Sequence, residues 1–238
     1  MVNIRIVIGI IGGGSLKLQG EPQGERVVST PYGEPSSPIR FVAVKGQIFA
    51  LIFRHGLEGS TPPHRINYRA NIEALASLGV KGIIGINSVG SLKEGIPPGS
   101  LVVPDDFLCL WSSVTFFDDR AFHVVPRLDE GLRSALIDAA KRAGFEALDR
   151  GVYVQTIGPR LETKAEVKFL GMIGDVVGMT MVHEAVLCCE RGIPYASLCT
   201  VDNYAHGVGK GTLGQEQIRA MARQNAEKVA RVLKELRL

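Results

Sequence analysis

The sequence of 238 residues is poor in cysteine and has almost no excess of charge of one sign. Its four cysteines, Cys109, Cys188, Cys189 and Cys199, have neither the spacing of a metal site nor that of a disulfide framework. Cys188 and Cys189 are adjacent in an apolar segment, which predicts buried thiols in a reducing compartment. The formal charge of +3 is spread along the chain, so a basic, nucleic-acid-binding surface is excluded.

Long apolar runs are also absent from the sequence. No stretch reaches the roughly 18 uninterrupted apolar residues of a membrane span, so we expect no transmembrane helix and no membrane as a partner. Residues 2–11 are apolar enough to resemble a signal peptide, but Arg5 is their only positive charge and Gly12–Gly14 follow directly. We therefore expect a buried first strand and a cytoplasmic protein.

The overall composition is that of an ordered α/β protein. Apolar residues make up 45% of the chain and charged residues 21%, which excludes disorder. The 28 glycines are too many for a helical bundle and fit strands, tight turns and ligand-approaching loops. Because 238 residues are near the upper limit for one hydrophobic core, we expect a single domain over residues 1–238.

Hydrophobic patterning predicts alternating strands and helices. A hairpin is expected around Lys45-Gly46, which implies a mixed sheet. The last helix carries an apolar stripe of Ile218, Met221, Ala222, Val229, Leu233 and Leu236, which predicts that it packs on the body of the domain. The expected strands cover residues 4–11, 26–30, 41–44, 47–53, 81–87, 100–103, 151–156 and 194–201, and the expected helices cover 67–79, 129–144, 163–172, 181–191 and 214–236. The fold class is α/β, with a three-layer α/β/α arrangement around a central mixed sheet.

Two familiar motifs are incomplete. His183-Glu184 begins like a zinc-protease helix, but Leu187 stands where the second histidine ligand belongs. Gly209-Lys210 resembles a phosphate-binding P-loop, but Gly211 replaces the required serine or threonine. Neither a zinc protease nor a P-loop enzyme is predicted.

Three segments at strand ends could together bind phosphate. Gly12–Ser15 offers unhindered backbone N–H groups and a hydroxyl, the chemistry of an anion-binding nest, although a plain tight turn has the same sequence. Arg54-His55-Gly56 adds a permanent cation and an imidazole after an apolar strand. Asn87–Ser91 follows the buried strand 81–87, where α/β proteins usually form their ligand crevice.

Three further segments carry polar groups near predicted element ends. Thr163 and Glu166 form a capping box at the start of a helix, which leaves the Glu162 carboxylate free for another task. Met179 lies between a strand and a helix, where it could also be a simple core residue. Polar residues of Thr200–Tyr204 close the strand 194–201.

These segments resemble those of one family. In order, GIIGGGSL, RHG, INSVGSL, GPRLETKAE, VGMTMVHE and YASLCTVDNY look like the motifs of the trimeric purine nucleoside phosphorylase and methylthioadenosine phosphorylase family. The resemblance runs from about residue 8 to residue 204. It implies a phosphorylase-like fold, working as a homotrimer or a dimer of trimers, in which phosphate cleaves a purine nucleoside to the free base and a ribose 1-phosphate or its 5-methylthio analogue.

The resemblance also implies a role for each motif residue. The protein must hold phosphate below the sugar and stabilise negative charge on the departing purine. No metal or organic cofactor is expected, because inorganic phosphate is a co-substrate. By similarity, phosphate is bound by Ser15, Arg54, His55, Ser88 and Thr180, ribose by Met179 and the base by Leu161, Glu162 and Asn203, with Asn203 and His55 as catalytic residues.

The base-binding residues favour a 6-oxopurine. Glu162 would accept a hydrogen bond from N1–H of hypoxanthine or guanine and would repel the bare N1 of adenine. Asn203 would donate to N7, and the aminopurine-specific branch has aspartate at this position. Counting from Tyr195 assigns Asn203 and not Asp202 to the base, because neighbouring strand residues face opposite sides. Inosine, guanosine and methylthioinosine are the expected substrates.

Two positions depart from the family pattern, and two alternatives remain. The hydroxyl of Ser15 is shifted by one residue in its loop, and His183 stands where the family commonly has proline. Phe116, Phe117 and His123 lie in a variable segment that in family members reaches the site of a neighbouring subunit. A methylthioadenosine phosphorylase is the alternative, and a non-catalytic purine-binding protein, which would lack the phosphate-binding residues, is a remoter one.

Overall fold

The computed structural model describes residues 6–14, 16–111, 114–209 and 214–238. In these residues all strands join one sheet with the path β2-β3-β4-β1-β5-β10-β9-β7, and β11, β6 and β8 branch from β5. The strands are β1 (Ile6–Gly12), β2 (Glu21–Arg26), β3 (Ile39–Val44), β4 (Gln47–Phe53), β5 (Ile83–Ser91), β6 (Leu101–Val102), β7 (Asp106–Cys109), β8 (Ala147–Leu148), β9 (Val152–Gln155), β10 (Val176–Gly178) and β11 (Tyr195–Tyr204). The helices are η1 (Pro63–Arg65), α1 (Tyr68–Ser77), α2 (Glu130–Arg142), α3 (Lys164–Ile173), α4 (Met181–Glu190) and α5 (Gln215–Lys234).

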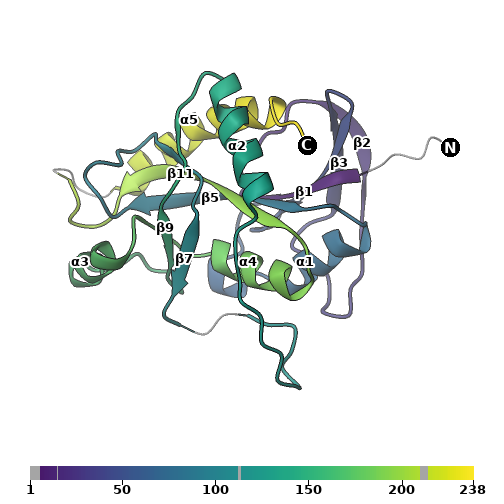
Figure 1. Ribbon diagram of the computed structural model, residues 1–238, viewed down its shortest axis with the longest axis horizontal. Coiled ribbons are helices and arrows are strands. Elements are labelled where there is room, and N and C mark those ends of the chain that lie inside the picture. The colour runs from purple at the N-terminus through teal and green to yellow at the C-terminus, as the bar shows by residue number, and fades with distance from the viewer. Residues whose placement is uncertain (1–5, 15, 112–113, 210–213) are drawn as a thin grey trace.

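The sheet is mixed and lies between two helical layers, as predicted. β4, β1, β5 and β11 run parallel to one another, whereas β3 and β4 form an antiparallel hairpin. In Figure 1, α1 and α4 cover one face of the sheet and α2 and α5 the other. Among the described residues, one hydrophobic core lies under each pair of helices, and a smaller cluster includes Val167 and Leu170 of α3. The three-layer α/β/α architecture is confirmed.

Local sequence signals set several element boundaries. Lys45 and Gly46 both have positive φ, 48° and 79°, which is the backbone required in the two-residue turn of the β3–β4 hairpin. The Thr163 side chain accepts a hydrogen bond from the Glu166 amide, and the Glu166 carboxylate accepts one from the Thr163 amide, so the predicted capping box starts α3. Asn67 caps α1 in the same way, by accepting from the Ala70 amide.

The structure corrects the expected ends of two strands. β5 continues from the predicted end at Asn87 to Ser91, and β11 continues past residue 201 to Tyr204. The two extensions pair with each other, with Tyr204 opposite Ser91, so polar residues expected in loops belong to strands. The strand expected at residues 26–30 lies at Glu21–Arg26, and β7 and β8 were not predicted at all.

The last helix also differs from its prediction. Val229, Leu233 and Leu236 are buried in the core, as expected from the apolar stripe. Ile218 and Ala222, in the first half of α5, are only partly buried and line a cavity instead. The second half of the apolar stripe is therefore part of the hydrophobic core, and the first half forms a wall of the cavity.

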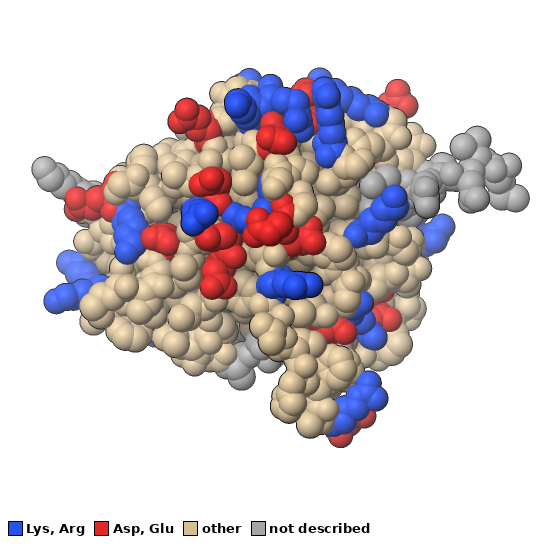
Figure 2. Space-filling model, viewed as in Figure 1, with Lys and Arg blue, Asp and Glu red and all other residues tan. Residues whose placement is uncertain are grey.

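The surface carries charges of both signs. On the face shown in Figure 2, acidic side chains gather near the middle, and Lys and Arg side chains lie among them and along the top. This mixture agrees with the small formal charge of +3. No helix in the described part of the chain is long and apolar enough to cross a membrane.

Candidate active site

A cavity of about 320 Å³ lies where the carboxyl ends of β1, β4, β5 and β11 meet, beside the end of β10. This is the usual position of a ligand site in α/β sheets. Eight of the nine candidate residues line it, namely Arg54, His55, Ser88, Leu161, Glu162, Met179, Thr180 and Asn203. The ninth, Ser15, is outside the described residues, but Gly13 and Leu16 on either side of its loop line the same cavity.

Arg54 is a buried cation at the inner end of the cavity. Its Nε donates to Glu184 Oε1 at 2.7 Å and its Nη2 to Glu184 Oε2 at 3.1 Å. Further N–H groups donate to the carbonyl oxygens of Ile86 and Ile11. Burial alone lowers the pKa of a guanidinium, but the Glu184 carboxylate raises the pKa of Arg54 above its ordinary value. Arg54 is therefore charged and held rigidly by its partners.

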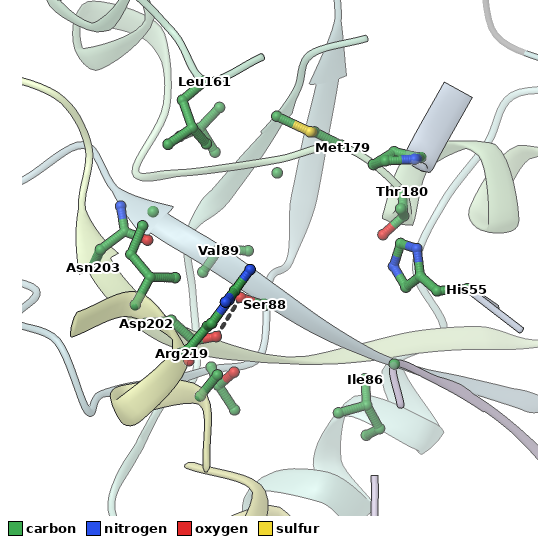
Figure 3. A pocket seen from close by; sticks show the side chains of 18 of the residues that line it. His55, Ile86, Ser88, Val89, Leu161, Met179, Thr180, Asp202, Asn203 and Arg219 are labelled. Carbon is green, nitrogen blue, oxygen red and sulfur yellow. Dashed lines mark hydrogen bonds between the residues drawn. The ribbon is translucent and has the colours of Figure 1, made fainter. Parts of the chain in front are cut away.

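His55 follows directly and is held in one tautomer. Its Nδ1 lies 2.8 Å from the carbonyl oxygen of Thr61, which can only accept, so Nδ1 carries the hydrogen. Burial and the neighbouring charge of Arg54 lower the pKa of His55 below its usual value, although the Thr61 contact opposes this. The ring is then neutral at pH 7, and Nε2 is left as an acceptor. Figure 3 shows this ring beside Thr180 in the cavity.

Two hydroxyl groups that line the cavity donate to acceptors within the protein. Thr180 Oγ1 donates to Asn87 Oδ1 at 2.8 Å, and Asn87 Nδ2 in turn donates to Ser197 Oγ at 2.8 Å. Ser88 Oγ donates to Asp202 Oδ2, the bond drawn as a dashed line in Figure 3. Both hydroxyl hydrogens thus point away from any molecule in the cavity.

Asp202 and Asn203 both reach the cavity, contrary to the expectation that neighbours in a strand face opposite sides. Val201 pairs with Val89 and Asn203 with Gly90, so the β11–β5 register passes over Asp202. An extra residue of this kind is a β-bulge, which redirects side chains on its strand. Asp202 is 3% exposed, and it lines the cavity together with Asn203.

The base-binding candidates lie at the other end of the cavity. Glu162 is 9% exposed and Glu162 Oε1 accepts from the Thr156 hydroxyl at 2.7 Å, which leaves Oε2 for another partner. Asn203 Nδ2 donates to the Tyr204 carbonyl oxygen at 2.8 Å, and the amide has a second N–H. In Figure 3, Leu161 lies at this end and Met179 lies between Leu161 and Thr180. The Glu162 carboxylate is thus less free than the capping-box argument predicted, but it keeps one oxygen.

Two glycines allow the close packing around this end of the cavity. A Cβ at Gly178 would lie 2.2 Å from the Tyr153 hydroxyl, and one at Gly158 would lie 2.5 Å from the sulfur of Met179. Gly158 also has a φ of 67°, which side chains rarely adopt. The Met179 side chain can therefore lie against this turn only because residue 158 is glycine.

The comparisons with known proteins agree with the predicted family. The family described as the phosphorylase superfamily matches residues 7–236. The chain belongs to the phosphorylase superfamily.

Relatives in the superfamily match over nearly the whole chain. A protein named as a probable 6-oxopurine nucleoside phosphorylase of Archaeoglobus fulgidus is 42% identical, over 96% of this chain and 95% of its own. The S-methyl-5′-thioadenosine phosphorylase of Pyrococcus horikoshii is 40% identical, over 95% and 90%. Among solved structures, methylthioadenosine phosphorylase from Schistosoma mansoni in complex with tubercidin has a TM-score of 0.88 at 29% identity, covering 97% of this chain and 90% of that one. These relatives are enzymes, and so is this superfamily member.

Three residues of this superfamily member were missed as parts of the site. Glu184 holds Arg54; the sequence places it in an incomplete zinc motif and in the family motif VGMTMVHE but gives it no role in the site, and its signal is an acidic residue between apolar ones in α4. Asp202 is not assigned to the base by counting along the strand, and no sequence signal marks the bulge that brings it and Asn203 to one cavity. Arg219, in the first part of α5, lines the cavity and extends across the Ser88–Asp202 pair in the view of Figure 3.

Proposed function

We propose that this chain catalyses the phosphorolysis of purine nucleosides with a 6-oxopurine base, giving the free base and ribose 1-phosphate or 5-methylthioribose 1-phosphate. One observation carries the proposal: a single cavity is lined by an arginine, a histidine and two hydroxyl groups as well as by a carboxylate and an amide, namely Arg54, His55, Ser88, Thr180, Glu162 and Asn203. In Figure 3, His55 and Thr180 lie at one end of it, Asn203 lies at the other, and Ser88 lies between them. The arginine, histidine and hydroxyl groups suit an anion, and the carboxylate and amide suit the edge of a purine. The ribose would then lie between them, against Met179.

At the phosphate end, each group has a defined chemical role. Arg54 supplies a rigidly held guanidinium near the anion, although Glu184 compensates its charge. His55 Nε2, an acceptor in the neutral ring, binds the hydrogen of a protonated phosphate oxygen and so orients the anion towards the sugar. Ser88 and Thr180 donate to phosphate oxygens once their hydroxyl groups rotate into the cavity. Ser15 adds a further hydroxyl in this proposal.

At the base end, the reaction needs stabilisation of a departing purine anion. The free oxygen of Glu162 accepts from N1–H of hypoxanthine or guanine. The second N–H of Asn203 donates to N7, where negative charge accumulates as the glycosidic bond breaks. Adenine offers no N1–H, so it would leave the Glu162 oxygen facing a lone pair. Mismatches of this kind can cost about four orders of magnitude in kcat/KM.

A second candidate substrate is a 5′-methylthio nucleoside. The Pyrococcus horikoshii relative is named for S-methyl-5′-thioadenosine, and a Methanocaldococcus jannaschii relative, 40% identical, is named as a probable S-methyl-5′-thioinosine phosphorylase. Ile218 and Ala222 of α5 give one wall of the cavity an apolar surface that suits a methylthio group. Methylthioinosine would combine this wall with the 6-oxopurine recognition by Glu162.

The decisive experiment compares inosine, guanosine, methylthioinosine, adenosine and methylthioadenosine side by side, with and without phosphate. We expect phosphate-dependent cleavage with the highest kcat/KM for a 6-oxopurine nucleoside. A preference for the adenine compounds would contradict the role of Glu162 and favour a methylthioadenosine phosphorylase. Cleavage that proceeds equally in phosphate-free buffer would contradict phosphorolysis itself.

We further propose a homotrimer, or a dimer of trimers, of single-domain subunits. Large apolar side chains are exposed around a hollow beside Glu162, including Leu110 at 51%, Trp111 at 39% and Phe169 at 49%. A patch of this kind is typical of a subunit interface. Sedimentation analysis of the wild type and of Trp111→Glu tests this, with dissociation expected only in the variant.

The proposal includes no metal or organic cofactor, because phosphate is itself the nucleophile. It also includes a cytoplasmic location, in keeping with the buried thiols of Cys188 and Cys199.

A further inference from the structure

Ser88 has one hydroxyl hydrogen, and in the structure that hydrogen is donated to the Asp202 carboxylate. Ser88 is on the exposed side of β5 and faces the cavity, where the proposed function makes it a phosphate ligand. A hydroxyl can donate to only one acceptor at a time. While Asp202 holds the hydrogen, Ser88 offers the cavity only lone pairs, which repel an anion.

Asp202 is fixed firmly in this position. Its other oxygen, Oδ1, accepts from Asn225 Nδ2 of α5 at 2.7 Å, and Nδ2 is also within 3.1 Å of the Val201 carbonyl oxygen. Asn225 is completely buried and Asp202 is 3% exposed. Burial raises the pKa of Asp202, against the effect of its hydrogen bonds from Ser88 and Asn225. Both hydrogen bonds therefore stabilise the buried carboxylate, and breaking either one costs free energy.

The second hydroxyl of the phosphate end provides an internal comparison. Thr180 also donates its hydrogen within the protein, but its acceptor is the neutral amide oxygen of Asn87. Hydrogen bonds to charged groups are about twice as strong as those between neutral groups. Turning Ser88 towards phosphate therefore costs more than turning Thr180, because a charged acceptor must be left behind.

We propose that Asp202 is a positioning residue that holds the Ser88 hydroxyl hydrogen away from the phosphate subsite and thereby weakens phosphate binding. The inference rests on the proposed function, because that function makes Ser88 a phosphate ligand. Phosphate and the carboxylate then compete for one hydrogen, and the bulge at Asp202 places the competitor within reach. The affinity of this chain for its co-substrate is set by that competition.

Asp202→Asn tests the competition with little change of shape. The new amide can keep its oxygen towards Asn225 and turn its NH₂ towards Ser88 Oγ, which releases the serine hydrogen for phosphate. We expect the Kd and the KM for inorganic phosphate to fall about five-fold or more, the difference between a charged and a neutral acceptor. The KM for the nucleoside should stay within about two-fold, which a general structural defect would not allow.

The control is the same substitution made in a Ser88→Ala protein. If Asp202 acts through the serine hydroxyl, Asp202→Asn changes the phosphate Kd less than about two-fold in that background. An equal change in both backgrounds would show that Asp202 acts by its charge alone and would overturn the proposal. An unchanged or higher phosphate Kd in the single variant would overturn it as well.

Titration calorimetry with inorganic phosphate alone separates this inference from the proposed function. Phosphate binding that responds to Asp202→Asn as expected supports the inference, whichever nucleoside is cleaved. A wild-type protein that cleaves nucleosides without phosphate and does not bind phosphate would contradict the proposed function, on which the inference rests. Asp202→Ser, which removes the carboxylate entirely, is the second variant should Asp202→Asn not fold, and the same fall in Kd is expected.

Discussion

The buried pair of Arg54 and Glu184 leads to the most quantitative prediction for this fold. The Arg54 side chain is 2% exposed and the Glu184 side chain 1% exposed, and two N–H groups of Arg54 bind the two carboxylate oxygens. Tyr195 donates a third hydrogen bond to Glu184 Oε2 at 2.8 Å. The carboxylate is thus surrounded by donors, and the substitution to test is Glu184→Gln, which keeps the shape and removes the charge.

The magnitude follows from what the glutamine would meet. With its oxygen towards Arg54 Nε, its NH₂ group would face Arg54 Nη2, so two donors would oppose each other. The Arg54 charge would also lose its only acidic partner among the described residues while remaining buried. Removing one member of a buried ion pair costs about 3–5 kcal/mol. For a chain of this length that corresponds to a fall of about 6 to 20 °C in Tm.

The assay is equilibrium unfolding in urea at fixed protomer concentration, with thermal unfolding as a second measurement. The matched control is Glu25→Gln, because Glu25 pairs with Arg40 at 3.6 Å and both side chains are about half exposed. An exposed pair contributes less than about 1 kcal/mol. If Glu184→Gln lowers the free energy of unfolding no more than Glu25→Gln does, Arg54 is not held as a buried charge and the reasoning fails.

Single substitutions also test the base contacts, the acid stability and the packing of this chain. Asn203→Asp should raise the ratio of kcat/KM for adenosine over inosine, and an unchanged ratio would contradict the contact with N7. Glu162→Gln should lower kcat/KM for inosine about 10- to 100-fold through loss of a charged acceptor, with Tm nearly unchanged. Burial lowers the pKa of His183 to about 4, so the unfolded chain binds this proton more readily, and the free energy of unfolding should fall as the pH drops from about 6.5 towards 4; His183→Leu should lose that part of the slope. Gly178→Ala should cost about 1–3 kcal/mol in urea unfolding, because its Cβ would lie 2.2 Å from the Tyr153 hydroxyl, and a smaller cost would show that Tyr153 can move.

Features that depend on a few neighbouring residues could be predicted from the sequence. The hairpin at Lys45-Gly46 and the capping box of α3 are fixed by local backbone and side-chain chemistry, and both were expected correctly. The amphipathic helices and apolar strands also follow from local periodicity. The family resemblance then identified the site residues in advance, and all of those that the structure describes line the cavity.

Features that depend on distant partners could not be predicted in this way. β5 and β11 continue through polar residues because Ser91 and Tyr204 pair across the sheet, and no pattern in either segment reveals the other. Arg54 and Glu184 are 130 positions apart, so their ion pair is invisible in the sequence. Alternation assigned Asp202 and Asn203 to opposite sides of β11, but a bulge adds one residue at Asp202 and brings the following side chain, Asn203, to the same cavity.

The charges around the cavity determine how a phosphate dianion could be held there. Arg54 is compensated by Glu184 behind it, and His55 is neutral at pH 7. Two acidic side chains, Glu162 and Asp202, line the cavity, and Arg219 is the one lining arginine besides Arg54 among the described residues. The described site therefore has no surplus of positive charge with which to attract phosphate. Its affinity for phosphate must therefore come from directed hydrogen bonds, which depend less on salt than attraction between exposed charges does. For the same reason, the direction of the single hydroxyl hydrogen of Ser88 has a large effect on phosphate affinity.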